Sequence, residues 1–127
     1  MGKRDGEEMT NQPEQQSIAQ RVHVMAVSKG WWNDPLEHRV PRLLDWLLEE
    51  VEEAREAYLY FKTDDFTSID AEGLEKPEGF GSELADLSLI IDDLALGTGI
   101  DLDAQKEKKL AYNLVRKYKR DYKGDKL

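Results

Sequence analysis

Two pairs of acidic residues stand out because the members of each pair are three residues apart. Glu50 and Glu53 form the first pair, and Glu83 and Asp86 form the second. Residues at i and i+3 are neighbours on a helix surface, so each pair can direct two carboxylates at one cation. If Val51 marks the centre of the apolar stripe, the first pair lies beside that stripe. Oxygen ligands without histidine or thiolate favour Mg²⁺, with Mn²⁺ as a substitute, and the spacing therefore predicts a magnesium site.

The second acidic pair lies in a segment, residues 82–96, that is apolar on almost every side. Such a helix is expected in the interior of a bundle, where an unpaired carboxylate is costly. No lysine or arginine occurs between Lys76 and Lys106, so a metal ion is the simplest partner. The competing interpretation is a solvated acidic face, and it applies most strongly to residues 49–53.

A di-iron carboxylate centre is the main rival metal site, and it needs Glu-x-x-His pairs. Only His23 and His38 are present, and neither follows a glutamate by three residues. The chain has no cysteine, which excludes disulfides, thiolate zinc sites and a cysteine nucleophile. The acidic pairs therefore remain the best candidates for chemistry.

Charge is divided unevenly along the chain, whose formal net charge is −9. Residues 45–93 hold sixteen acids and three bases, whereas residues 104–127 hold nine bases and three acids. The overall acidity argues against a nucleic-acid binder, and a ligand that carries both metal and phosphate suits the division. No apolar run of about 18 residues occurs, so we expect no membrane span. The lack of cysteine fits a cytoplasmic location.

The elements that must position these residues are helices, because apolar residues recur with a helical period and strand signals are weak. Four helices are predicted, over residues 13–29, 41–62, 82–96 and 101–123. Their boundaries are marked by residues with helix-ending or helix-starting preferences, namely Gly30, Pro41, Ser82 and Asp101. Two loops separate the first three helices, over residues 31–40 and 63–81.

We therefore expect an all-α four-helix bundle formed by a single domain over residues 13–123. A flexible tail is expected over residues 1–12 and a short C-terminal tail over residues 124–127. One small bundle can barely cover a helix as apolar as residues 84–96, so we expect a homodimer or a dimer of dimers.

The acidic motifs resemble those of the MazG-like branch of the all-α nucleoside triphosphate pyrophosphohydrolases, which also includes dimeric dUTPases and dCTP pyrophosphatases. The family pattern is Glu-Glu-x-x-Glu, a spacer, and then Glu-x-x-Asp, and residues 49–53 and 83–86 are similar to it. The resemblance covers about residues 31–118. The spacer is slightly longer than usual, which suggests an enlarged substrate loop, and Glu52 replaces a small residue.

The resemblance implies hydrolysis of a nucleoside triphosphate to the monophosphate and pyrophosphate, with Mg²⁺ held by the four carboxylates of the two pairs. It implies that Glu50 and Glu53 belong to the catalytic set. Glu49 is the candidate for orienting or deprotonating the attacking water, and its alternative is a solvated surface acid.

The last predicted helix carries basic and amide residues on one face, and the resemblance extends to Lys109, Asn113 and Arg116. These residues are predicted to bind substrate phosphates, because lysine offers a point charge and arginine a planar fork. A basic helix of one subunit can then close over the acidic site of another. The alternative is a basic face that only contacts solvent.

Two adjacent tryptophans, Trp31 and Trp32, precede the first acidic motif. One is expected to fill the core and the other to stack on a nucleobase. Trp32 together with His38 is similar to a Trp and His found in dCTP-hydrolysing relatives, although a structural role is the alternative. The sequence does not indicate which base is preferred. A non-enzymatic helical adaptor with an acidic groove is the alternative function.

Overall fold

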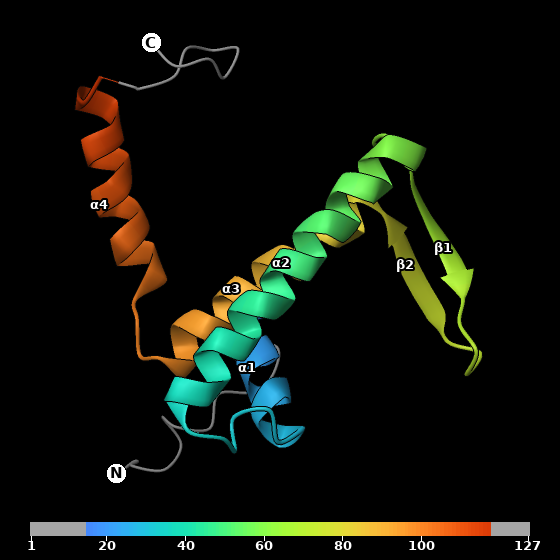
Figure 1. Cartoon of the computed structure of the whole chain (residues 1–127), viewed down its shortest axis with the longest axis horizontal. Coiled ribbons are helices and arrows are strands. Elements are labelled where there is room, and N and C mark those ends of the chain that lie inside the picture. Colours follow the sequence, from blue (N-terminus) through green and yellow to red (C-terminus); the bar gives the residue numbers. More distant parts are fainter. Residues whose placement is uncertain (1–14, 118–127) are drawn as a thin grey trace.

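The computed structural model describes residues 15–117, which form four helices and one β-hairpin (Figure 1). In chain order the elements are α1 (Ile18–Ser28), α2 (Leu36–Phe61), β1 (Asp65–Ile69), β2 (Glu75–Gly79), α3 (Phe80–Gly97) and α4 (Leu102–Val115). The expected all-α four-helix bundle is wrong, because the structure contains a sheet and because α4 stands apart from the other helices. The two predicted tails, and the predicted end of the last helix at residue 123, lie outside the described residues.

The segment predicted as a long loop is the antiparallel hairpin β1–β2. Its register pairs Asp65 with Gly79 and Ile69 with Glu75. At the tip, the carboxylate of Asp70 accepts backbone hydrogen bonds from Glu72 and Leu74, each at 2.9 Å, which closes the turn locally. The hairpin is two-stranded and largely exposed, so it needs no alternating apolar pattern. Its strands therefore give no strand signal in the sequence.

Local capping sets the starts of α1 and α4. The predicted start at residue 13 is wrong, because α1 begins at Ile18. Ser17 and Gln20 form a capping box at the start of α1, and Asp101 accepts a hydrogen bond from the Ala104 amide at 3.0 Å. The start of α2 was placed too late. This helix begins at Leu36, where the Pro35 carbonyl accepts the first backbone bonds, so Pro41 lies inside it.

The start of α3 was also misplaced, because Ser82 is not its N-cap. The helix follows Gly79 directly, and the Ser82 hydroxyl donates to the Pro77 carbonyl at 3.2 Å. Gly79 has φ +110°, and a Cβ there would lie 2.5 Å from the Asp64 carbonyl oxygen. Glycine is therefore required where the hairpin passes into α3.

The body of the molecule is α3 packed against both α1 and α2. Helices α2 and α3 run antiparallel side by side, and the hairpin that connects them projects from one end of the pair (Figure 1). Its core is small. Leu43 is the only large side chain among the described residues that is fully buried, and the remaining core is mostly alanine with Ile90. The expectation that α3 is enclosed is wrong, since Leu84 and Ile91 are exposed.

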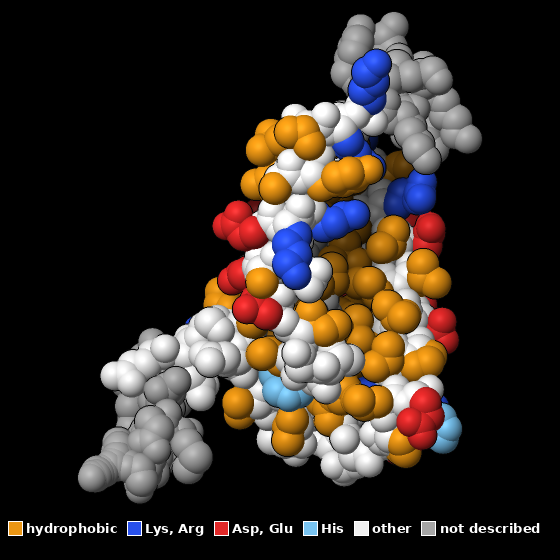
Figure 2. Space-filling model, turned by 90° about the vertical axis from the view of Figure 1, so that its left-hand side faces the viewer, with side chains coloured by type: hydrophobic (Ala, Val, Ile, Leu, Met, Phe, Trp, Pro, Cys, Tyr) orange, Lys and Arg blue, Asp and Glu red, His pale blue; other side chains and the backbone are white. Residues whose placement is uncertain are grey.

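Helix α4 leaves the body after α3 and buries none of its residues (Figure 1). Its apolar side chains Leu114 and Val115 are 76% and 82% exposed. Figure 2 shows that hydrophobic side chains also crowd the surface of the body beside α4. Helix α2 also exposes apolar side chains, namely Leu44, Leu48 and Val51.

Candidate metal centre and adjoining cavity

Three carboxyl groups from two antiparallel helices meet in one place. Glu50 comes from the middle of α2, and Glu83 and Asp86 come from the first two turns of α3. One oxygen of each lies within 4.8 Å of the others. These three residues are called the acidic cluster below. Because α2 and α3 are antiparallel, three of the four residues predicted as metal ligands come together across the interface between these helices, and Glu53 is not among them.

Glu50 lies deeper than the sequence indicated. It is only 8% exposed and falls in the buried line of α2 that also holds Leu43, Ala54 and Ala57, whereas Val51 is exposed. The alanines allow α3 to approach closely, which places Glu50 between the helices rather than beside the stripe.

Electrostatics of the acidic cluster disfavour charge on its members. Burial, followed by the hydrogen bond with Glu53 and the negative charge of its neighbours, raises the pKa of Glu50 from 4.5 to about 7. Burial and the charge of Asp86 likewise raise the pKa of Glu83. One Glu83 oxygen, Oε2, is buried with no hydrogen-bond partner. No lysine or arginine in the described chain forms an ion pair with the cluster, so a divalent cation fits the donor set.

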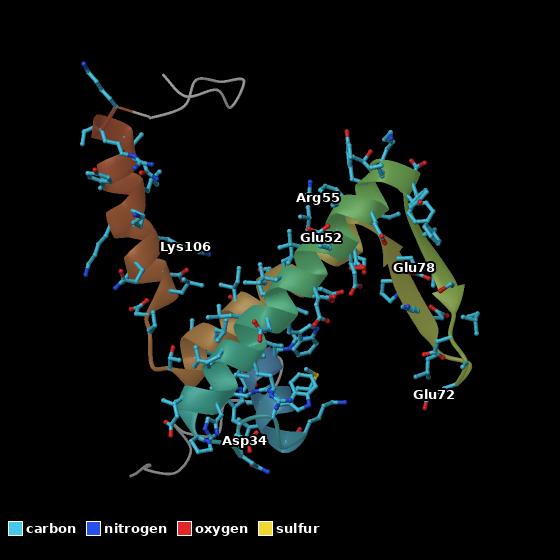
Figure 3. All side chains as sticks on the ribbon, viewed as in Figure 1. Asp34, Glu52, Arg55, Glu72, Glu78 and Lys106 are labelled. Atoms are coloured by element: carbon cyan, nitrogen blue, oxygen red, sulfur yellow. The ribbon has the colours of Figure 1, made fainter. Side chains whose placement is uncertain are left out.

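The other acids of the first motif have different environments. Glu53 is exposed and lies close enough to Glu50 for a hydrogen bond, so it borders the acidic cluster without joining the closest three. Glu52 is 69% exposed and pairs with Arg55 at 3.4 Å on the outer side of α2 (Figure 3). Glu49 lines a separate polar groove with Arg39 and Asp45. The structure therefore does not bring Glu49 to the cluster.

A cavity of about 220 Å³ adjoins the acidic cluster. Glu50 and Asp86 form part of its wall, Trp31 and Trp46 contribute aromatic rings, and Asp93 lies two helical turns beyond Asp86. The two tryptophan rings pack edge to face with their centroids 5.5 Å apart. We call this space the aromatic cavity. Sequence analysis missed Trp46, although its position four residues before Glu50 places it on the same side of α2.

Asp93 is the most deeply buried acid among the described residues, at 3% exposed. Its Oδ1 accepts two hydrogen bonds, from His23 Nδ1 at 2.7 Å and from Trp32 Nε1 at 2.9 Å. Trp32 also packs on Gly97, where a Cβ would overlap its ring. Sequence analysis did not identify this group, because His23 and Asp93 are far apart in the chain.

Two of the predicted substrate-binding residues, Trp32 and His38, are not part of the aromatic cavity. Trp32 is engaged with Asp93, while His38 is exposed in the polar groove beside Arg39. The Arg39 guanidinium lies 5.8 Å from the ring centroids of both Trp31 and Trp32, which supports the aromatic wall from behind. Of the residues predicted to contact the base, only Trp31 lines the cavity.

The predicted phosphate-binding residues lie on or next to α4 and are not brought to the acidic cluster of the same chain. Lys109 and Arg116 both approach the Tyr112 ring, at 5.9 Å and 5.3 Å from its centroid. Asn113 has a buried Oδ1 without a hydrogen-bond partner. Within one chain, the acidic and basic parts of the predicted site are therefore separate.

Comparisons of the chain with protein-family models, curated proteins and solved structures return no match. None of the helices in the described part of the chain combines the length and the apolar character needed to cross a membrane.

Proposed function

We propose that this protein is a Mg²⁺-dependent nucleoside triphosphate pyrophosphohydrolase that converts a nucleotide to its monophosphate and pyrophosphate. The observation that carries the proposal is the acidic cluster. Three carboxyl groups share one small space with no basic partner in the described chain, beside a cavity with aromatic walls. The resemblance of residues 49–53 and 83–86 to the family motifs supports the same reaction.

Glu50, Glu83 and Asp86 are the residues that would hold the metal. A bound Mg²⁺ would neutralise charge on phosphate oxygens and lower the pKa of a bound water. Glu53, which is exposed at the border of the cluster, is the candidate to accept the proton of the attacking water. The water oxygen forms a bond to the α-phosphorus, and the bond between the α-phosphorus and the bridging oxygen breaks to release pyrophosphate.

Helix α4 of a second copy completes the site in this proposal. The acidic cluster has no basic side chain beside it. Lys109 lies on α4 and Arg116 caps its C-terminal end, and α4 buries none of its residues. A closed symmetric pair satisfies both needs, because each α4 covers apolar surface on the other copy and brings positive charge to its phosphates. We therefore propose a homodimer or a dimer of dimers.

The test of the activity is pyrophosphate release from a panel of canonical and modified nucleoside triphosphates in Mg²⁺. Asp86→Asn is the test variant, since it removes a ligand charge and keeps the side-chain shape. Glu52→Gln is the matched control, because Glu52 faces solvent on the same helix as Glu50. Failure of the wild-type protein to release pyrophosphate from any nucleotide excludes the proposed reaction.

The alternative, a helical adaptor, would use the exposed apolar surface of α2 and α4 for a partner and would not need metal. The thermal midpoint separates the two functions. Binding of Mg²⁺ to the native state alone raises the midpoint, whereas an adaptor without a metal site shows no such shift.

Light scattering at micromolar concentration tests the assembly. The chain mass is 14.6 kDa, so a dimer or tetramer is resolved without ambiguity. Full activity at the mass of one chain would show that a single copy builds the whole site.

A further inference from the structure

We propose that the aromatic cavity binds the base of the nucleotide and that Asp93 selects bases bearing an exocyclic amino group. The inference rests on the proposed function, because it takes the ligand to be a nucleotide whose phosphates lie at the acidic cluster. It goes beyond that function by assigning a substrate class and the residue that recognises it.

The position of the cavity fits a nucleotide that extends from the acidic cluster. Asp86 and Asp93 both line the cavity and are seven residues apart on α3, which separates them by roughly 10 Å along the helix. Phosphates held at Asp86 thus leave the base near Asp93. A cavity of about 220 Å³ has room for one base, given that an engineered cavity of roughly 150 Å³ binds benzene.

The walls of the cavity suit a flat aromatic ligand. The rings of Trp31 and Trp46 are nearly perpendicular, with an interplanar angle of 79°. The two indoles already contact each other, so a ligand ring lies against the wall that they form and not between them, and both stacking and edge-to-face contact with that wall are favourable. Such stacking tolerates any base, so it supplies affinity and leaves the selection to a polar group.

Asp93 is the polar group at the end of this cavity, and only one of its two oxygens is occupied. Oδ1 accepts from His23 and Trp32, which fix the carboxylate in place. Oδ2 has no hydrogen-bond partner in the described chain. It is not one of the fully buried side-chain atoms that lack a partner, so it is accessible. Because Oδ2 is accessible and lacks a donor, a ligand that donates to it forms a charge-assisted hydrogen bond.

An exocyclic amino group is the donor that matches Oδ2. Cytosine and adenine present such a group on the edge that pairs in duplexes, whereas uracil and hypoxanthine present a carbonyl oxygen at the same place. A carbonyl oxygen facing a carboxylate repels it and leaves it without a partner. A site built to bond one group discriminates strongly against the analogue that lacks it.

The experiment measures binding of nucleoside monophosphates, which carry the base and have no anhydride bond to cleave. The probes are two matched pairs, dCMP with dUMP and dAMP with dIMP, titrated into the full chain in Mg²⁺ by calorimetry. We expect the amino member of at least one pair to bind roughly tenfold to hundredfold more tightly than its carbonyl partner. Equal affinity within both pairs, a preference for a carbonyl member, or no binding of any probe overturns the inference.

Asp93→Asn provides a test by reversal. The amide oxygen can keep the bonds from His23 and Trp32, which turns the amide nitrogen, a donor, toward the cavity. The variant is expected to prefer the carbonyl member of the pair. Asp92→Asn is the matched control, since the same change one residue away lies outside the aromatic cavity, and it should retain the wild-type preference.

The wild-type titrations decide the inference even if Asp93→Asn fails to fold. Pyrophosphate release from dCTP and dUTP is measured in parallel to separate this inference from the proposed function. Selective binding without release contradicts the reaction and leaves the base cavity standing. Release of pyrophosphate together with equal affinity within both pairs of monophosphates contradicts the base selection alone.

Discussion

The raised pKa of Glu50 predicts that the metal-free protein loses stability as pH rises from about 5 to 8. Its pKa is about 7 in the folded chain against an ordinary value of 4.5, because burial and the neighbouring carboxyls disfavour its charge. The folded state then binds more protons than the unfolded state between these two values. The sign follows from linkage: stability is greatest below pH 4.5 and falls until pH exceeds about 7.

The size of the effect follows from the same values. The difference between 4.5 and about 7, at about 1.4 kcal/mol for each pH unit, corresponds to about 3.5 kcal/mol of lost stability. The raised pKa of Glu83 acts in the same direction. This is a large fraction of the stability of a small domain, so the metal-free protein should be markedly weaker at pH 8 than at pH 5.

Urea unfolding in the presence of a chelator, followed by circular dichroism at pH 5, 6, 7 and 8, measures the effect. Glu50→Gln keeps the shape of the protonated carboxyl and cannot ionise. The variant should differ least from the wild type at pH 5 and exceed its stability by up to about 3.5 kcal/mol at pH 8. Glu52→Gln serves as control, because that exposed side chain should give no comparable gain.

Addition of Mg²⁺ at pH 8 should restore the stability of the wild type and have little effect on Glu50→Gln, because metal ligands must be deprotonated. The reasoning is refuted if Glu50→Gln is no more stable than the wild type at pH 8 in chelator. It is also refuted if the difference between the two proteins does not change with pH.

Three further predictions follow from the site and its supports. Asp86→Asn should abolish pyrophosphate release with an unchanged circular dichroism spectrum, and near wild-type turnover would contradict the metal centre. Arg116→Ala should raise the KM for the triphosphate far more than it lowers the unfolding free energy, whereas an unchanged KM means a merely solvated basic face. Gly97→Ala should destabilise the protein by about 1–3 kcal/mol through overlap with Trp32, and urea unfolding that shows a stabilised variant would refute this packing.

Sequence analysis located the acidic cluster because its evidence is local. Spacing of three residues within a helix is read directly from the chain, and so is the capping residue Asp101. The recurrence of apolar residues with a helical period also identified α2 and α3 as helices. It misjudged the depth of Glu50, because the buried side of a helix depends on the partner that packs there.

Features that depend on distant contacts were missed. The bond between His23 and Asp93 joins α1 to α3 and leaves no trace in sequence spacing. The hairpin was hidden because Pro77 and charged residues occupy its strands, where pairing alone sustains the fold. The separation of α4 from the body also escaped detection, since an amphipathic helix has the same pattern whether it packs on its own chain or on another.

The hairpin allows the chain between residues 49–53 and 83–86 to change in length without moving the acidic cluster. Pairing of Asp65 with Gly79 fixes the ends of the connection, and the tip lies at the far end of both strands (Figure 1). Residues inserted in equal numbers on both strands at the tip lengthen the ribbon without shifting Glu53 relative to Glu83, because the paired ends of the strands next to α2 and α3 keep their register. The tip around Gly73 is thus a tolerant place to add a label or a binding peptide while the carboxylates keep their positions.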